Sequence, residues 1–210
     1  MQIEYASFPA RADRSAYIAH RFSRFLSTSV LDVGCDMAVL KGLLPTVAYT
    51  GIDIGGKPDL QLNLERIERL PFADGAFHST VCSDVLEHLD NLHHTFNELV
   101  RVTAKHVIIS LPNNWANARK PIGRGRGSFG FYGLPIEPPK DRHKWFFSLS
   151  EADAFMKGQA RKHGLTVSAC FACEKPRLTV VRWARRLRYP RQECYLNRYS
   201  HTLWAVLTKG

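Results

Sequence analysis

The chain has 210 residues, of which 45% are hydrophobic and 23% charged, and its formal net charge is +10. This length and composition are typical of one soluble globular domain and exclude a disordered or fibrous chain. No apolar run approaches the ~18 residues that cross a bilayer, and the N-terminus lacks the features of a signal peptide, so the sequence predicts a cytoplasmic protein.

The basic excess is concentrated in two stretches. Residues 113–136 contain four bases and no acid, and residues 175–191 contain seven bases and no acid. Such patches favour an anionic ligand, a nucleic acid or an anionic membrane surface as a partner.

The five cysteines suggest no disulfide framework. Cys170 and Cys173 have the two-residue gap of a metal or redox pair, but no second pair completes a zinc site. A core strand that contains small sulfur side chains is the favoured interpretation.

Hydrophobic periodicity predicts alternating strands and helices in the first half of the chain. Strands are predicted at 30–33, 49–53, 60–64, 77–83 and 106–111. Amphipathic helices are predicted at 12–26, 37–44 and 86–102. This order predicts an α/β fold, a doubly wound and mostly parallel sheet whose ligands bind at the carboxyl ends of its strands.

The second half of the chain breaks this rhythm. Residues 113–147 contain five glycines among bases and aromatic residues, which predicts a long functional connection without regular structure. A helix near 150–163 and strands at 165–173 and 199–207 follow. The sequence therefore predicts one domain with a seven-stranded sheet and an antiparallel last strand. It also predicts insertions at about 113–147 and about 174–198.

Two acids stand at the ends of the first two predicted strands. Asp32 is followed by Gly34 in a tight turn, where a ligand can approach bare backbone and the N–H groups of a helix start. Asp53 ends the next strand, close to the roughly 20-residue spacing of a ribose-binding carboxylate in a nucleotide site. A full dinucleotide-binding turn is missing, which disfavours an oxidoreductase.

The order of these signals resembles the class I S-adenosylmethionine-dependent methyltransferases, and within them the broad type 11 group, which form a Rossmann-like sheet. The matching blocks are residues 31–35, 51–53, 70–77, 82–89, 98–102 and 108–113. The resemblance covers about residues 29–113 well and the rest in outline. It implies S-adenosylmethionine as the cofactor.

The resemblance also assigns residues to the cofactor. Asp32 and Gly34 hold its methionine end, and Asp53 accepts hydrogen bonds from both ribose hydroxyls. Asn63 stands where the family usually has an acid that meets the adenine amino group. The full predicted set is Asp32, Gly34, Cys35, Asp53, Ile54, Asn63, Leu64, Cys82 and Ser83.

One departure from the family pattern concerns the opening turn. Asp36 and Ala38 replace two further glycines. An aspartate near the carboxylate of the cofactor is unfavourable unless it points away or caps the following helix. This departure leaves open a non-catalytic subunit with the methyltransferase fold.

Three residues are predicted as the general base of the reaction: His88, His143 and Asp84. Asp84 and His88 follow the fourth predicted strand. His143 lies in the segment 141–147, which is expected to be either a lid over the cofactor or the packed start of the next helix.

No metal site is predicted. The pairs at 87–88 and 93–94 contain histidine and glutamate, but this pattern favours a solvated helix surface over a set of metal ligands.

The predicted function is methyl transfer to a polar acceptor, a small molecule or a glycan. The resemblance points to a cell-surface glycan or a lipid-linked precursor. Among enzymatic functions, methylation of RNA is the alternative. The stretch 175–191 is predicted to be either an interfacial helix on anionic lipid or a helix packed on the sheet by its apolar side, with RNA binding a lesser third option.

Overall fold

The computed structural model describes residues 1–210, and all eight strands belong to one sheet. Their order is β1-β7-β8-β6-β5-β2-β3-β4. The bounds are β1 (Gln2–Tyr5), β2 (Ser29–Val33), β3 (Ala48–Asp53), β4 (Leu60–Gln61), β5 (Phe77–Ser83), β6 (Thr103–Pro112), β7 (Thr166–Glu174) and β8 (Ser200–Thr208).

The sheet has the predicted mixed character. Strands β2, β3, β4, β5 and β6 pair in parallel, and β8 runs antiparallel between β6 and β7. All seven predicted strands are present. The eighth strand, β1, was not predicted. It pairs in parallel with β7 and so forms the edge at which the sequence placed the β7–β8 hairpin.

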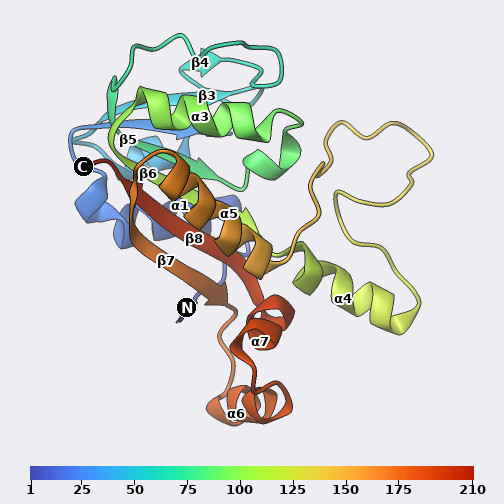
Figure 1. Ribbon diagram of the computed structural model, residues 1–210. Helices are drawn as coiled ribbons and strands as arrows, with labels where there is room; N and C mark the ends of the chain where they lie inside the picture. The colour runs from blue at the N-terminus through green and yellow to red at the C-terminus, as the bar shows by residue number, and fades with distance from the viewer.

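Seven α-helices accompany the sheet (Figure 1). They are α1 (Arg11–Arg21), α2 (Val39–Leu43), α3 (Leu92–Val102), α4 (Asn114–Arg124), α5 (Leu149–Lys162), α6 (Thr179–Arg188) and α7 (Gln192–Tyr199). None of them combines the length and apolarity that a bilayer crossing needs.

Strand alternation produces two apolar cores, one on each face of the sheet. Val81 and Ile108 point into a cluster with the α1 residues, whereas their neighbours Cys82 and Ile109 point into a larger cluster that α3 and α5 complete. Because consecutive side chains of a strand face opposite ways, the inner strands contribute apolar side chains to both faces. Asp32, Asp53 and Ser83 lie at or next to the carboxyl ends of β2, β3 and β5.

Two predicted segments differ from the structure. Residues 114–124, expected to be irregular, form α4: the side chain of Asn113 accepts the Ala116 N–H, and Gly125, at φ +63°, ends the helix. The expected helix over 86–102 is split into a 3₁₀ turn at Leu86–His88 and the helix α3. The split turns residues 84–88 across the carboxyl ends of the strands.

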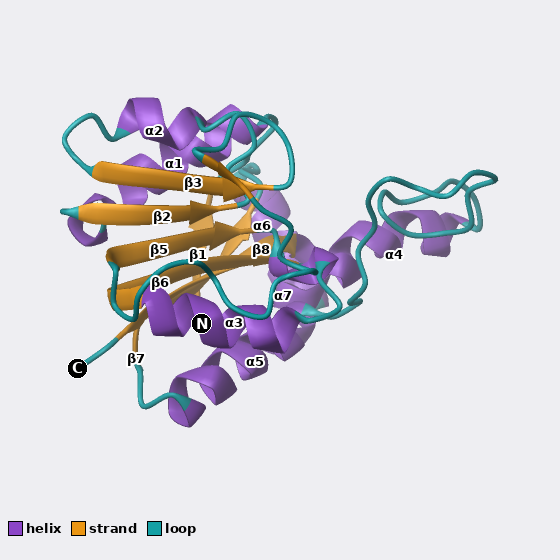
Figure 2. Cartoon of the chain, turned by 90° about the horizontal axis from the view of Figure 1, so that it is seen from above, coloured by secondary structure: helices purple, strands orange, loops and turns teal.

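Figure 2 shows the arrowheads of β2, β3 and β5 pointing toward the side of the molecule on which α4, α6 and α7 lie. Both predicted insertions therefore border the edge where ligands bind in this fold.

Candidate active site

The turn after β2 requires a glycine. Gly34 has φ +76°, and a Cβ atom at this position would lie 2.2 Å from Cγ2 of Val85. Its N–H donates to the Ile52 carbonyl at 2.9 Å, which ties the turn to β3. The turn therefore tolerates no side chain at residue 34.

Asp32 lies beneath this turn at the end of β2. Its carboxylate is buried and accepts a hydrogen bond from the Tyr49 hydroxyl at 2.6 Å. Burial raises the pKa of Asp32 to about 6, although the bond from Tyr49 acts in the opposite direction. The site therefore holds an acid whose pKa lies above the usual range of an aspartate.

The two residues that stand in place of glycines keep the backbone conformation of a glycine turn. Asp36 and Ala38 have φ values of +49° and +52°, in the left-handed region. The Asp36 carboxylate pairs with Arg11 of α1 at 2.6 Å and does not cap α2. The charge that a cofactor carboxylate would meet is therefore countered by a base that the sequence did not associate with the site.

Asp53 is fixed by two backbone donors. Its Oδ2 accepts the Asp36 N–H at 2.8 Å and its Oδ1 accepts the Gly55 N–H at 3.1 Å. Each oxygen keeps a second lone pair, so the carboxylate can still accept two hydroxyl groups. Ile54 next to it is 63% exposed and Met37 is 50% exposed, so two apolar side chains stand uncovered beside the carboxylate. This combination fits a ribose with an attached flat base.

The remaining predicted cofactor residues lie along the same edge. Asn63 uses its amide oxygen to accept the Glu65 N–H at 3.0 Å, which leaves one lone pair on that oxygen for a ligand. The Leu64 carbonyl accepts a bond from Asn91 at 2.8 Å. Cys35 and Cys82 are buried, and burial raises the pKa of both thiols, so they are neutral packing residues at pH 7.

A polar network follows β5. The Ser83 hydroxyl bonds that of Ser110 at 2.9 Å, and Ser110 donates to Asp84 at 2.5 Å. The other carboxylate oxygen of Asp84 pairs with Arg14 of α1 at 2.8 Å. The Nε atom of Arg14 is buried and has no hydrogen-bond partner, so this guanidinium has a donor available for an anion. The only sequence signal for this role of Arg14 is that Arg11 and Arg14 lie three residues apart at the start of α1, the helix that precedes β2.

Glu87, His88 and His143 form a cluster beside this network, with one ligand-type atom of each within 4.8 Å of the others. Glu87 is only 1% exposed, so the expectation of a solvated surface at 87–88 is wrong for this residue. Burial raises the pKa of Glu87 well above its usual range. Its Oε2 has no partner. His93 and His94 are exposed, as predicted.

The two histidines of the cluster are held differently. His88 bonds Asp141 through Nδ1 at 2.7 Å, and its Nε2 lies 3.9 Å from Oε1 of Glu87. His143 is buried with its Nδ1 3.2 Å from Nδ2 of Asn114. Burial lowers the pKa of His143 to about 4, so its ring is neutral at pH 7.

The segment 141–147 lies across the carboxyl end of β5. The Lys144 N–H donates to the Glu87 carbonyl at 2.8 Å, and its ammonium group pairs with Glu65 and Asp90 at 2.9 and 2.6 Å. The indole of Trp145 donates to the Leu89 carbonyl at 2.7 Å. These bonds explain why Glu87 is buried, since the covering residues come from a distant part of the chain.

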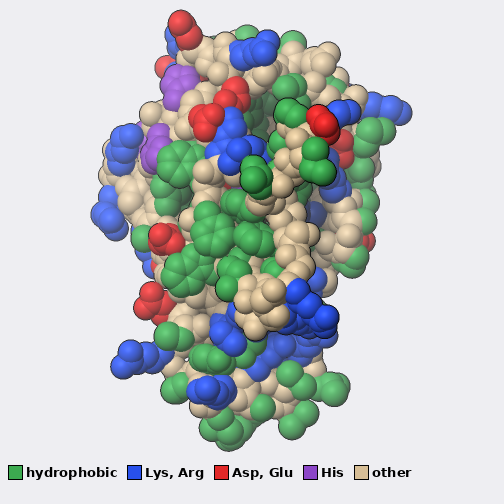
Figure 3. Space-filling view, turned by 90° about the vertical axis from the view of Figure 1, so that its right-hand side faces the viewer, with side chains coloured by type: hydrophobic (Ala, Val, Ile, Leu, Met, Phe, Trp, Pro, Cys, Tyr) green, Lys and Arg blue, Asp and Glu red, His purple; other side chains and the backbone are tan.

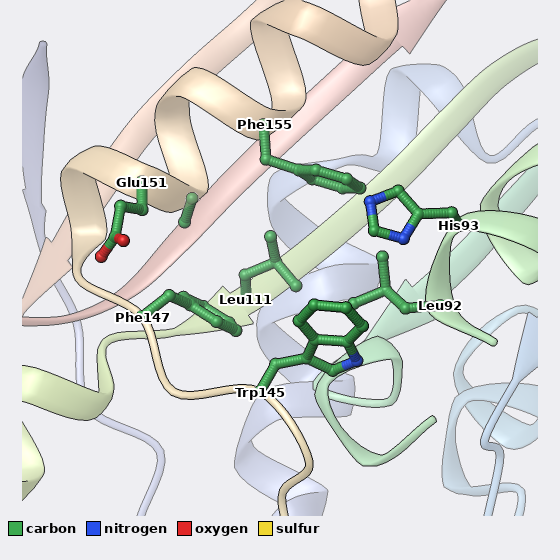
Figure 4. Close-up of a pocket in the computed structure, with 8 residues that line it drawn as sticks. Leu92, His93, Leu111, Trp145, Phe147, Glu151 and Phe155 are labelled. Atoms are coloured by element: carbon green, nitrogen blue, oxygen red, sulfur yellow. The ribbon is translucent and has the colours of Figure 1, made fainter. Parts of the chain in front are cut away.

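An apolar cleft of about 160 Å³ opens on the other side of this segment (Figure 4). Its lining residues come from α3, β6, α5 and the segment itself: Leu92, His93, Leu111, Trp145, Phe147, Glu151, Ala152 and Phe155. Figure 4 shows Trp145 and Phe155 approaching the cleft from the segment and from α5. The cleft can hold an apolar group of a ligand.

Known proteins resemble this chain in part of its sequence and in its fold. Residues 31–111 match the family model described as a methyltransferase domain. No curated protein matches the sequence.

Several solved structures share the fold. An S-adenosylmethionine-dependent methyltransferase from Archaeoglobus fulgidus is 15% identical, with a TM-score of 0.60 and 95% of each chain covered. One from Mesorhizobium loti is 12% identical, with a TM-score of 0.56 over 93% of this chain and 98% of the other.

Magnesium protoporphyrin IX methyltransferase from Synechocystis PCC 6803, solved with bound S-adenosylhomocysteine, is 15% identical with a TM-score of 0.52. Here 95% of this chain and 82% of the other are covered. Identities this low establish only the shared fold. Residues 31–111 are thus similar to a methyltransferase domain, and the chain as a whole has the fold of the S-adenosylmethionine-dependent methyltransferases.

Proposed function

We propose that the enzyme transfers the methyl group of S-adenosylmethionine to a hydroxyl group of a polar acceptor, such as a cell-surface glycan or a lipid-linked glycan precursor. The observation that carries the proposal is the polar cluster of Glu87, His88 and His143 beside the turns that hold the cofactor residues. A hydroxyl group must lose its proton during methyl transfer, and such a cluster at the reacting edge serves that step.

The cofactor supplies an activated methyl group on a sulfonium. Asp32 and the Gly34 turn hold the methionine end, Asp53 holds the ribose, and Arg14 offers its free donor to the carboxylate of the cofactor. In-line alignment of the acceptor with the methyl group can supply about 7–11 kcal/mol of the barrier reduction. Most of the catalytic task is therefore positioning.

Of the three predicted bases, His88 is the residue on which we centre acceptor activation. Both oxygens of Asp84 are engaged, by Ser110 and Arg14. His143 is buried. His88 has one nitrogen fixed by Asp141 and the other free of any hydrogen bond, which is the arrangement of an oriented catalytic imidazole.

Calorimetry tests the cofactor assignment. We expect S-adenosylmethionine and S-adenosylhomocysteine to bind and NAD not to bind. Asp53→Ala should abolish binding of the first two, because the ribose loses its acceptor. Absence of binding to both sulfur compounds would contradict the proposal.

A methyl-transfer assay with labelled cofactor tests the acceptor. The panel contains glycan precursors, their lipid-linked forms and RNA. His88→Ala should lower turnover on the active acceptor by about 10²–10⁴-fold while cofactor binding is retained. His94→Ala, on exposed helix surface, is the matched control. Full turnover in His88→Ala would remove His88 from the mechanism.

RNA is the second candidate acceptor. The helix α4 projects from the body of the molecule near the site and carries Arg119, Lys120 and Arg124 (Figure 1). Binding to RNA should then fall steeply with salt, because phosphate contacts release counterions. Methylation of RNA but not of glycan precursors would replace the first proposal by this one.

A further inference from the structure

The buried carboxyl group of Glu87 lacks a partner. Its Oε2 atom makes no hydrogen bond, although the residue is 1% exposed. Buried polar oxygens in native proteins are nearly always bonded to something. His88 and His143 each place a ring atom within 4.8 Å of a Glu87 oxygen and of each other. Three ligand-type groups therefore converge on one point beside an unsatisfied oxygen.

The surroundings orient the two imidazoles. Asp141 bonds Nδ1 of His88 at 2.7 Å, and Asn114 approaches Nδ1 of His143 at 3.2 Å. Metal-ligating histidines usually donate a hydrogen bond from the nitrogen that does not bind the metal, as Nδ1 of His88 can do to Asp141. Ligation through Nε2 of His143 places its proton on Nδ1, so the Asn114 amide would have to turn its oxygen to this ring and give up the bond that this oxygen accepts from the Phe147 N–H.

We propose that Glu87, His88 and His143 bind a divalent transition-metal cation of the zinc type. Two imidazoles and one carboxylate leave a fourth coordination position open, as in catalytic zinc sites. The sequence predicted no metal here because it assigned 87–88 to solvated surface and could not bring His143 to them.

The catalytic consequence rests on the proposed function. The acceptor hydroxyl occupies the open position, where the cation lowers its pKa and its proton leaves to water. The acceptor oxygen then attacks the methyl carbon. The new carbon–oxygen bond forms as the carbon–sulfur bond breaks, and the electron pair of that bond goes to sulfur. With the cation bound, Nε2 of His88 is a ligand, and His88 activates the acceptor through the metal instead of acting as the general base itself.

Binding of the metal alone tests the site. Chelator-treated protein is titrated with Zn²⁺, Mn²⁺ and Mg²⁺ by calorimetry, and with Co²⁺ by absorption spectroscopy. We expect one cation per chain and a four-coordinate Co²⁺ spectrum. Glu87→Gln and His143→Ala should lose the spectrum, and Asp141→Asn should weaken binding by about 10–100-fold. His94→Ala should bind the cation as the parent protein does.

Two outcomes would overturn the proposal: no stoichiometric binding of any cation, or unchanged binding in Glu87→Gln and His143→Ala. Circular dichroism checks that each variant folds. If Glu87→Gln or His143→Ala does not fold, the weaker metal binding expected of Asp141→Asn tests the site instead. Binding of S-adenosylhomocysteine should survive chelation. A failure of the metal site is therefore distinguishable from a failure of the methyltransferase function.

A second, independent inference concerns α6, which has its apolar face outward. Val180, Trp183 and Leu187 are 70%, 67% and 68% exposed, and they share one helix face at spacings of three and four. The half-buried residues of the helix include Arg182 and Arg186. This is the reverse of a helix packed on the sheet by its apolar side.

Arginine contacts hold α6 in this orientation. Arg182 lies 4.3 Å from the ring centroid of Tyr5, and Arg186 lies 4.1 Å from that of Tyr195. Arg185 pairs with the buried Glu174 at 2.6 Å. Two arginine–aromatic contacts and one ion pair thus hold the polar face of α6 against the rest of the protein, and its apolar face stays exposed to solvent.

We infer that this face docks on an anionic lipid bilayer. Exposed bases flank it: Lys175, Arg177, Arg188 and Arg191. Figure 3 shows hydrophobic side chains at the lower end of the molecule, where α6 lies, with a band of Lys and Arg above them. A second copy of the chain would oppose like charges, and of the three apolar side chains only Trp183 could stack on a nucleic-acid base.

Vesicle sedimentation tests this surface. The full chain should bind phosphatidylglycerol-containing vesicles, bind pure phosphatidylcholine vesicles about tenfold less, and dissociate from the anionic ones in high salt. Leu187→Glu should abolish binding. Trp115→Ala, a half-exposed aromatic residue on α4, is the control. No binding to anionic vesicles, or self-association that Leu187→Glu abolishes, would overturn the inference.

Discussion

At the residue scale, Asp32 of the proposed cofactor site lowers the stability of the folded protein at neutral pH. Its carboxylate is buried at the end of β2, and burial raises its pKa to about 6. The folded protein therefore binds a proton between about pH 4 and 6 that the unfolded chain releases. Through this group the free energy of unfolding falls as pH rises from 4 to 6, and the deficit is complete above pH 6.

Asp32→Asn should remove this deficit. We expect a higher melting temperature than that of the parent protein at pH 7–8, by an amount equivalent to about 1–3 kcal/mol, and a difference that shrinks toward pH 4. The variant should also lose cofactor binding, because the amide cannot counter the ammonium group of the methionine. Thermal melts across this pH range, with calorimetry at pH 7.5, measure both. An equal or lower melting temperature at pH 8 would contradict the argument.

At the element scale, α3 fixes the turn that leads into β5. Glu98 accepts the Leu70 N–H at 2.7 Å, and Arg101 donates to the carbonyls of Leu70 and Phe72 at 3.0 and 2.8 Å. The two side chains also pair with each other at 2.7 Å. The turn before β5, which contains Pro71 and Gly75, is thereby attached to α3, a helix that comes later in the chain, after β5 and the 3₁₀ turn.

The hydrogen bonds from Arg101 are the main cause that lowers the pKa of Glu98. A lowered folded pKa contributes stability above the unfolded value, and this stability is lost as pH falls through the folded pKa. Glu98→Ala should therefore cost about 1.5–3 kcal/mol at pH 7 and less below pH 4. Urea unfolding at the two pH values measures the difference. A cost that is independent of pH would show that the charge is not involved.

The elements also show what sequence can and cannot predict. Period-2 and period-3.6 patterns located the seven predicted strands and most helices, because burial of one face sets both periods. Helix α4 was missed because its Pro121 and the neighbouring glycines are loop signals. The burial of Glu87 was missed because residues 143–145, which cover it, lie far along the chain, and local periodicity contains no record of that contact.

At the scale of the whole molecule, the N-terminal strand connects stability to the site. Glu4 on β1 accepts bonds from Arg21 at 2.6 Å and Tyr17 at 2.7 Å, both on α1. The same helix brings Arg11 to Asp36 and Arg14 to Asp84. The position of both bases at the site therefore depends on an anchor at the opposite end of their helix.

Glu4→Ala should weaken this anchor. We expect a loss of stability of about 1.5–3 kcal/mol, since a charge-assisted bond is removed and Tyr17 and Arg21 are left without their acceptor. Cofactor affinity should fall as well, but by less than in Arg14→Ala, because Glu4→Ala only shifts α1, whereas Arg14→Ala removes the arginine side chain itself. Glu4→Gln keeps an acceptor for Tyr17 and should lie between the parent and Glu4→Ala in both measurements. If Glu4→Ala lowers the melting temperature but leaves affinity for S-adenosylhomocysteine unchanged, the anchor serves the fold alone and the bases of α1 are positioned by Asp36 and Asp84.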